Sequence, residues 1–314
     1  MSDRCVLDLS CVTKTYGDFT AVRDLSFSVN AGGITGFLGP NGAGKTTTLR
    51  MILGMIAPSS GEIRVLGAPN ALKVRGRIGY LPEERGLYRK MTAAQSIAYL
   101  AQLKGMNGAS AKKSALNLLE RFGLKGFAHA RIEALSKGMA QKVQILAAIA
   151  HGPELIILDE PFSGLDPVNQ QVLEDLIREM ANEGRTLIFS THVMQHAERL
   201  CDRLILIAAG EKRFDGTLGE ARHLLPRRVR IAGRGDLSLF SKIPGVVSVT
   251  PDSDDGHDHG AIVITLAEGA DPQALLRAAF EGNVALERFE VREPSLHEVF
   301  VALAGDAARE AVVR

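Results

Sequence analysis

The sequence is poor in features that would place the protein outside the cell or within a membrane. It contains three cysteines, Cys5, Cys11 and Cys201, an odd number with no C-x-x-C pair. This pattern argues against a disulfide framework and against a zinc site, so we expect reduced thiols and a cytoplasmic location. No apolar run approaches the roughly 20 residues that span a bilayer, and the N-terminus lacks a signal-peptide pattern. Any membrane association is therefore expected to come through a partner.

The sequence also lacks a strong net charge. The formal charge of the 314 residues is +1, so no global field favours nucleic acid or a membrane surface as the partner. At roughly 150 residues per domain, a chain of this length is expected to form two domains. We find no internal repeat that would indicate a solenoid instead.

The clearest positive signal is a glycine-rich stretch, GPNGAGKT at residues 39–46, which fits the spacing G-x-x-x-x-G-K-[ST]. Glycine permits backbone conformations closed to other residues, so successive N–H groups can turn onto a phosphate. We expect Lys45 to bridge the β- and γ-phosphates and the Thr46 hydroxyl to hold Mg²⁺. An apolar strand at 34–38 and a helix at 46–56 flank the loop, as the motif requires. The predicted nucleotide-binding residues of the loop are Gly39, Pro40, Asn41, Gly42, Ala43, Gly44, Lys45, Thr46 and Thr47.

Two further predicted strands end in chemically active side chains. The apolar run 155–158 leads directly into Asp159 and Glu160, at the strand end where open α/β sheets bind ligands. Asp159 would hold Mg²⁺, directly or through water, and Glu160 would accept a proton from an attacking water. The strand at 186–189 is followed by His192, which would hydrogen-bond a γ-phosphate or that water; a surface histidine capping the next helix is the alternative.

The order of the elements predicts an α/β fold followed by a smaller α+β unit. Residues 5–38 read as short antiparallel strands, and later apolar strands alternate with helices, which predicts a parallel sheet. We expect this first domain to span residues 1–222, with a helical subdomain at about 85–152. The composition changes after 217, and the order β-α-β-β-α-β then predicts a ferredoxin-like domain over 226–314.

These motifs resemble the nucleotide-binding subunits of ABC transporters. The deciding segment is LSKGM at 135–139, which is similar to the family's LSGGQ signature and directly precedes a predicted helix. A serine hydroxyl and a glycine backbone at a helix N-terminus make an anion site. The resemblance implies that Ser136 and Gly138 bind the γ-phosphate of an ATP held by another subunit. SGLD at 163–166 matches the family's D-loop, which implies that Asp166 lies at the dimer interface.

The same resemblance assigns adenine stacking to Tyr16 and the switch position to His192. Two departures from the family pattern occur. The signature has Lys137 and Met139 where Gly and Gln are usual, and Glu83 replaces the lid glutamine, where its carboxylate could still reach Mg²⁺ or its water. These features, with EPSL at 293–296 followed by a phenylalanine, resemble bacterial exporter ATPases of the sodium-extrusion type, which carry a C-terminal accessory domain.

The resemblance implies an ATP-hydrolysing subunit with Mg²⁺ as its metal. Two such subunits, identical or paralogous, would dimerise on ATP and drive a separate membrane-spanning permease, for export, from the inner face of the cell membrane. No nucleic-acid partner is expected. The alternative is a soluble ABC-type ATPase acting on nucleic acid or ribosomes, but such proteins usually carry two cassettes or a long coiled-coil insert. A P-loop protein that serves only as a nucleotide switch is less consistent with Glu160 and His192 together.

Overall fold

The computed structural model describes residues 4–84, 86–252 and 261–305. The chain forms two compact units that divide between Leu218 and Gly219, with residues 303–305 grouped with the first unit. The domain limits expected from the sequence, 222 and 226, stay a prediction. No helix of the described ranges is both long enough and apolar enough to cross a bilayer.

The first unit is built on a six-stranded sheet with the strand order β5-β6-β7-β3-β8-β9. Its first five strands pair in parallel, and β9 pairs antiparallel with β8. The strands are β3 (Gly33–Leu38), β5 (Ile78–Leu81), β6 (Leu155–Asp159), β7 (Thr186–Thr191), β8 (Arg203–Ala208) and β9 (Glu211–Gly216). Every residue of β6 and β7 is buried, which accounts for the unbroken apolar runs of a parallel sheet covered on both faces.

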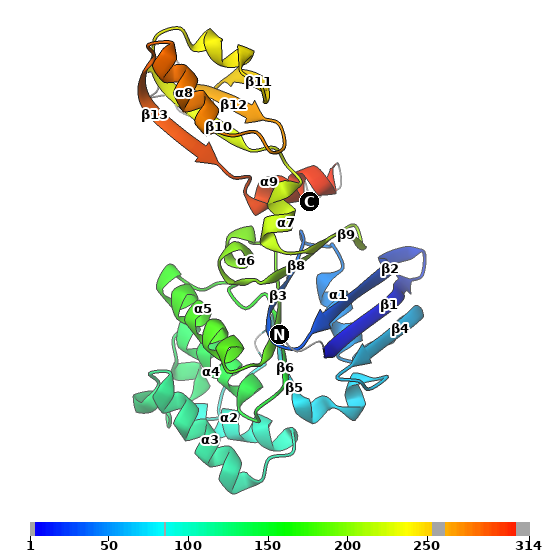
Figure 1. The fold of residues 1–314 in the computed structure, drawn as a ribbon. Coiled ribbons are helices and arrows are strands. Elements are labelled where there is room, and N and C mark those ends of the chain that lie inside the picture. The colour runs from blue at the N-terminus through cyan, green and yellow to red at the C-terminus, as the bar shows by residue number, and fades with distance from the viewer. Residues whose placement is uncertain (1–3, 85, 253–260, 306–314) are drawn as a thin grey trace. The chain divides into compact units, whose positions relative to one another are not determined.

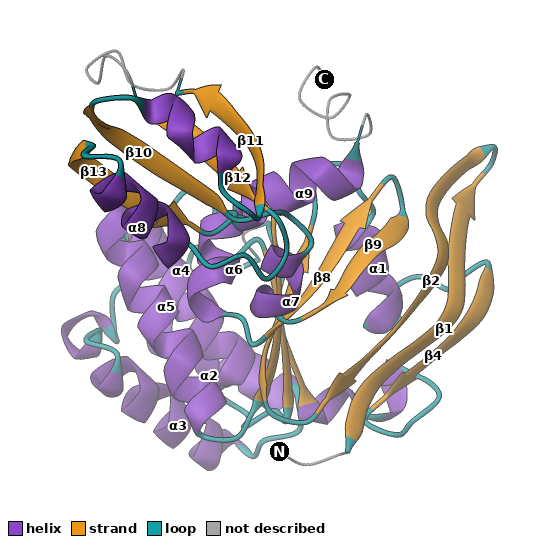
Figure 2. Cartoon of the chain, turned by 45° about the horizontal axis from the view of Figure 1, so that its top comes forward, coloured by secondary structure: helices purple, strands orange, loops and turns teal. Residues whose placement is uncertain are grey.

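A second sheet of the first unit is antiparallel, with the order β2-β1-β4. It consists of β1 (Cys5–Tyr16), β2 (Phe19–Asn30) and β4 (Ser60–Val65). Side chains from this sheet, from the parallel sheet and from α1 (Lys45–Ile52) share one apolar core, which includes Leu25, Phe37 and Leu49. In Figure 2 the antiparallel strands lie on one side of the parallel sheet and helices α2 to α5 on the other.

The described part of the helical subdomain expected at about 85–152 contains three α-helices. They are α2 (Ala93–Leu103), α3 (Gly108–Arg121) and α4 (Lys137–Ile149). Local sequence explains their starts, because Thr92 and Gln95 form a capping box and Asn107 accepts from the Ser110 N–H. Three further helices, α5 (Pro167–Asn182), α6 (Met194–Leu200) and α7 (Leu218–His223), follow along the chain (Figure 1).

The second unit has a four-stranded antiparallel sheet with the order β11-β12-β10-β13. Its elements are β10 (Arg228–Arg234), β11 (Val246–Pro251), β12 (Ile262–Leu266), α8 (Gln273–Glu281), β13 (Ala285–Arg292) and α9 (Leu296–Ala304). This order agrees with the expected ferredoxin-like arrangement, and Ser295 with Glu298 forms a capping box at the start of α9. The first helix of the predicted order is a short 3₁₀ helix at Leu237–Lys242, since Pro244 and Gly245 leave no room for further turns.

Candidate nucleotide-binding site

The glycine loop joins β3 to α1 in a conformation that its glycines alone permit. Gly42 and Gly44 have φ angles of +78° and +97°. At Gly39 an added Cβ would lie 2.2 Å from the Ile207 carbonyl oxygen, and at Gly44 it would lie 2.6 Å from that of Ala21. The loop is therefore fixed by close backbone contacts with β8 on one side and β2 on the other. The expected helix is shorter than predicted and ends at Ile52.

A cavity of about 390 Å³ opens over this loop. It is lined by Phe19, Ala21, Pro40, Asn41, Gly42, Gly44, Lys45, Thr46, Thr47, Glu83 and Glu160. The structure thus brings most of the loop residues predicted from sequence together with Glu83 and Glu160. Gly39 and Ala43 support the loop from beneath, since Ala43 is buried and the Gly39 N–H donates to the Thr191 carbonyl.

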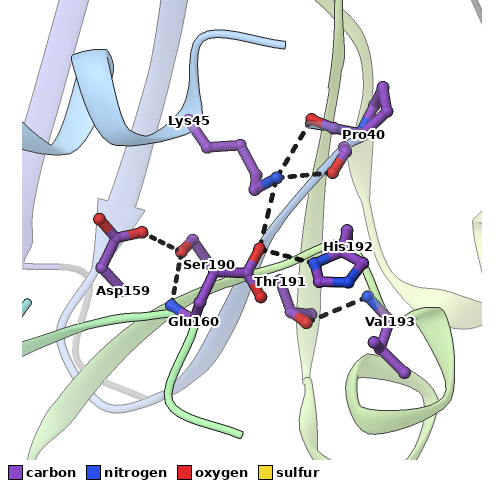
Figure 3. Close-up of polar contacts among 9 residues, drawn as sticks. Pro40, Lys45, Asp159, Glu160, Ser190, Thr191, His192 and Val193 are labelled. Carbon is purple, nitrogen blue, oxygen red and sulfur yellow. Dashed lines mark hydrogen bonds and ion pairs between the residues drawn. The ribbon is translucent and has the colours of Figure 1, made fainter. Parts of the chain in front are cut away.

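Lys45 is held inside the loop by backbone carbonyls. Its Nζ donates to the Gly39 oxygen at 2.7 Å and to the Pro40 oxygen at 3.2 Å, and it lies 3.4 Å from Glu160 Oε1 (Figure 3). Burial lowers the pKa of the Lys45 ammonium, an effect that the nearby Glu160 carboxylate opposes. The side chain is 6% exposed, so this cation is already positioned beneath the cavity.

Glu160 and His192 meet at the ends of β6 and β7. Glu160 Oε1 lies 3.0 Å from His192 Nδ1. The Glu160 backbone adopts a left-handed φ of +46°, and its N–H donates to the Ser190 hydroxyl at 3.0 Å. A left-handed φ is unusual for a residue other than glycine and often accompanies function. His192 is half exposed, which leaves it accessible to a bound ligand.

Asp159 has the surroundings of a magnesium ligand. The Ser190 hydroxyl donates to its Oδ1 at 2.5 Å, and the Ser190 and Thr46 hydroxyls both lower the pKa of the carboxyl group. Its other oxygen, Oδ2, is buried and has no hydrogen-bond partner among the described residues. Burial raises the pKa of Asp159, and a cation at this point would favour the ionised form. Carboxylate and hydroxyl oxygens are ligands that Mg²⁺ prefers, so the residues present fit this ion.

The signature and D-loop residues lie elsewhere, at the N-termini of α4 and α5. Ser136 caps α4 by accepting from the Met139 N–H, and Asp166 caps α5 by accepting from the Asn169 N–H at 2.9 Å. The two helix starts are in contact, because a Cβ on Gly138 would lie 2.6 Å from Asn169 Nδ2. Ser136 and Asp166 are exposed, and in the described chain neither they nor Gly138 lines the cavity.

Tyr16 is separate from the cavity as well. It ends β1, pairs across the turn with Phe19 and is half exposed, with Lys14 Nζ 5.0 Å from the ring centroid. The aromatic ring that lines the cavity belongs to Phe19. Sequence reasoning missed Phe19 and Ala21 because it weighed only the first of two aromatic residues in the same turn. The adenine-stacking role of Tyr16 stays a prediction.

Comparisons with known proteins extend over both units. Residues 22–163 match the family model of the ABC transporter, and residues 216–304 match that of the ATP-binding protein DrrA1-3-like, C-terminal domain. The ABC transporter ATP-binding protein YhaQ of Bacillus subtilis (strain 168) is 39% identical over 301 residues, covering 96% of this chain and 99% of that protein. This chain belongs to the ABC transporter ATP-binding proteins. This ABC ATPase also shares 36% identity with the Nod factor export ATP-binding protein I of Rhizobium meliloti (strain 1021), over 95% of the chain and 88% of that protein.

A solved structure supports the enzymatic assignment. An ATP-binding cassette determined as a dimer in a post-hydrolysis state, bound to ADP and phosphate, is 28% identical to this ABC ATPase with a TM-score of 0.62. The match covers 68% of this chain and 98% of the solved one. The family and this likeness identify the chain as an enzyme that binds and hydrolyses ATP for transport.

Proposed function

We propose that this ABC ATPase uses Glu160 and His192 to hydrolyse Mg²⁺-ATP and thereby powers export through a separate permease. The observation that carries the proposal is the contact of Glu160 Oε1 with both Lys45 Nζ, at 3.4 Å, and His192 Nδ1, at 3.0 Å. A base beside a phosphate-binding cation and a second water-orienting group is the arrangement that phosphoryl transfer to water needs.

In this proposal one set of residues binds the phosphates and Mg²⁺, and another set positions and deprotonates the attacking water. The N–H groups of the loop and the Lys45 ammonium bind the β- and γ-phosphates. Thr46 and Asp159 would hold Mg²⁺, with Glu83 as a further candidate ligand, and the bound ion would neutralise phosphate charge. Glu160 accepts the proton of the attacking water, and His192 keeps that water in line with the γ-phosphate.

The test of the catalytic assignment is Glu160→Gln. The amide keeps the shape of the side chain but cannot take a proton, so turnover should fall by about 10²- to 10⁴-fold. Binding of a fluorescent ATP analogue should persist, because the loop and Lys45 are untouched. Phosphate release and nucleotide titration measure the two effects. Glu62→Gln, an exposed carboxylate on β4, is the control, and equal turnover in both variants would contradict the assignment.

Export and the permease are proposed from relatives and from the chain itself. The printed name of the Rhizobium relative states export of Nod factor, and the described residues hold no membrane-spanning helix. A permease should therefore co-purify with this ATPase and raise its turnover when both are reconstituted in vesicles. Recovery of nucleic acid or ribosomes without a membrane protein would favour the soluble alternative.

A further inference from the structure

A buried cluster is formed by residues from the segments that adjoin Glu160 and His192 in the chain. It consists of Phe162, Glu174, Phe189 and His196, hereafter the His196 cluster, and each of these residues is 6% exposed or less. None of them lines the nucleotide cavity. A carboxylate and an imidazole are costly to bury unless each finds a partner, so their presence in this position calls for an explanation.

The four side chains are joined by specific contacts. His196 Nδ1 lies 3.1 Å from Glu174 Oε1. The imidazole stacks on the Phe162 ring, with a centroid separation of 4.0 Å and an interplanar angle of 12°. Phe162 in turn meets Phe189 edge to face at 5.8 Å. Since the Glu174 carboxylate only accepts hydrogen bonds, His196 must carry its proton on Nδ1 and donate it.

Each member of the cluster belongs to a segment that presents a functional residue. Phe162 follows Glu160 by two residues, and Phe189 precedes His192 by three along β7. His196 lies on α6, which begins two residues after His192, and Glu174 lies on α5, whose N-cap is the D-loop residue Asp166. The cluster therefore joins the three segments that carry the general base, the water-orienting histidine and the expected dimer contact.

We infer that His196 is a positioning residue that sets the Glu160 to His192 distance. Its hydrogen bond to Glu174 holds α6 against α5. Its ring stacks on Phe162 and thereby holds the turn that contains Glu160. Loss of the hydrogen bond leaves the buried Glu174 carboxylate with only its 3.5 Å ion pair to the exposed Arg199. We expect α5 and α6 then to move apart, so that the base and the histidine separate. The inference rests on the proposed roles of Glu160 and His192.

The first test compares substitutions within the hydrogen-bonded pair. His196→Phe keeps the stacked ring and removes the donor, and Glu174→Leu removes the acceptor; both should lower kcat by about ten-fold while the KM for ATP changes little. Glu174→Gln retains an oxygen that accepts from the His196 N–H, so this variant should keep most of the wild-type kcat. Leu25→Ala, in the core of the antiparallel sheet, controls for loss of stability alone.

The second test asks whether His196 acts through His192. In the His192→Ala background, His196→Phe should lower the remaining single-turnover rate by less than about two-fold, because the distance that it sets no longer matters. An unchanged kcat in His196→Phe overturns the inference. So does a ten-fold loss of rate when His196→Phe is added to His192→Ala. A rise in KM for ATP that accounts for the lower activity of His196→Phe overturns it as well. Wild-type turnover in Glu160→Gln and His192→Ala would instead show that the catalytic assignment itself is wrong.

Discussion

Glu83 and Glu160 line the same cavity, yet the two carboxylates differ in their surroundings. Glu160 is buried beside Lys45, whereas Glu83 is exposed and stands where the family pattern has a neutral glutamine. A carboxylate there repels the phosphates of free ATP and attracts the cation that accompanies them. At the scale of single residues, Glu83 should therefore tie nucleotide affinity to the metal.

The substitution Glu83→Gln tests this coupling. Removing the charge should tighten nucleotide binding in EDTA by a few-fold, about the worth of one exposed charge, and should raise the Mg²⁺ concentration needed for half-maximal turnover. Fluorescent nucleotide titrations with and without Mg²⁺ measure both effects. Glu84→Gln is the matched control, because Glu84 is the neighbouring exposed carboxylate and does not line the cavity. The same shift in Glu84→Gln would mean that the effect comes from the negative charge of this segment as a whole and not from the position of Glu83.

The residues of the phosphate loop were predictable because their chemistry follows from spacing within one short segment. The sequence predicts that Glu160 and His192 act on the same water, and their contact agrees with this, since both follow parallel strands that end at the same sheet edge. Phe19 and the His196 cluster were not predicted. Their roles depend on contacts between segments far apart in the chain, as between Glu174 and His196, and no local pattern reports such contacts.

At the scale of elements, the edge of the parallel sheet contains a pH-sensitive contact. His151 follows α4, and its Nε2 lies 3.2 Å from the Ile78 carbonyl at the start of β5. Burial, aided by the nearby Lys104 ammonium, lowers the pKa of His151 from 6.5 to about 4. Between these two values the unfolded chain binds a proton that the native protein does not, so stability should fall as pH drops.

Replacement of this histidine should flatten that dependence. His151→Gln keeps an N–H donor for the Ile78 carbonyl and removes the titrating group, so its urea midpoint should fall less than that of the wild type between pH 7 and pH 5. His129→Gln, at an exposed position, should retain the wild-type slope. Parallel slopes in all three proteins would mean that other groups dominate acid destabilisation.

Elements with strong periodicity or capping signals were predictable, and short polar ones were not. The three helices between 92 and 152 have clear N-caps, and β6 and β7 have continuous apolar runs. β9 escaped prediction because it is an edge strand, EKRFDG, whose residues are mostly polar and whose pairing with β8 is its main support. The sequence does not distinguish the 3₁₀ helix at 237–242 from an α-helix, because six residues are too few to separate 3.0 from 3.6 residues per turn.

At the scale of the whole molecule, we propose that one chain supplies only part of each active site, because Ser136 and Asp166 are exposed and do not line the cavity. If Ser136 acts on the nucleotide of a second copy, two defective chains should complement each other. Lys45→Ala removes the phosphate cation, and Ser136→Asp keeps a good helix cap while its carboxylate repels the γ-phosphate.

Each of these variants should be inactive alone, and an equal mixture should regain about a quarter of wild-type turnover, since half of the dimers are mixed and each of those has one intact site of two. Phosphate release after mixing in ATP measures the recovery. A mixture of Lys45→Ala with Glu160→Gln, both defects of the same half-site, should show none. Recovered turnover in the mixture of Lys45→Ala with Glu160→Gln would contradict the shared site. A lack of recovery in both mixtures would contradict it too.

The nucleotide cavity also has walls from two different sheets. Phe19 and Ala21 come from the antiparallel sheet, while the loop and Glu160 extend from the parallel one, with Gly44 closely packed on the Ala21 carbonyl. A nucleotide bound in this cavity would hold the two sheets together for as long as it stays bound. By linkage, ATP at a hundred times its Kd adds about 2.7 kcal/mol to native stability, and amide exchange should slow in both sheets together.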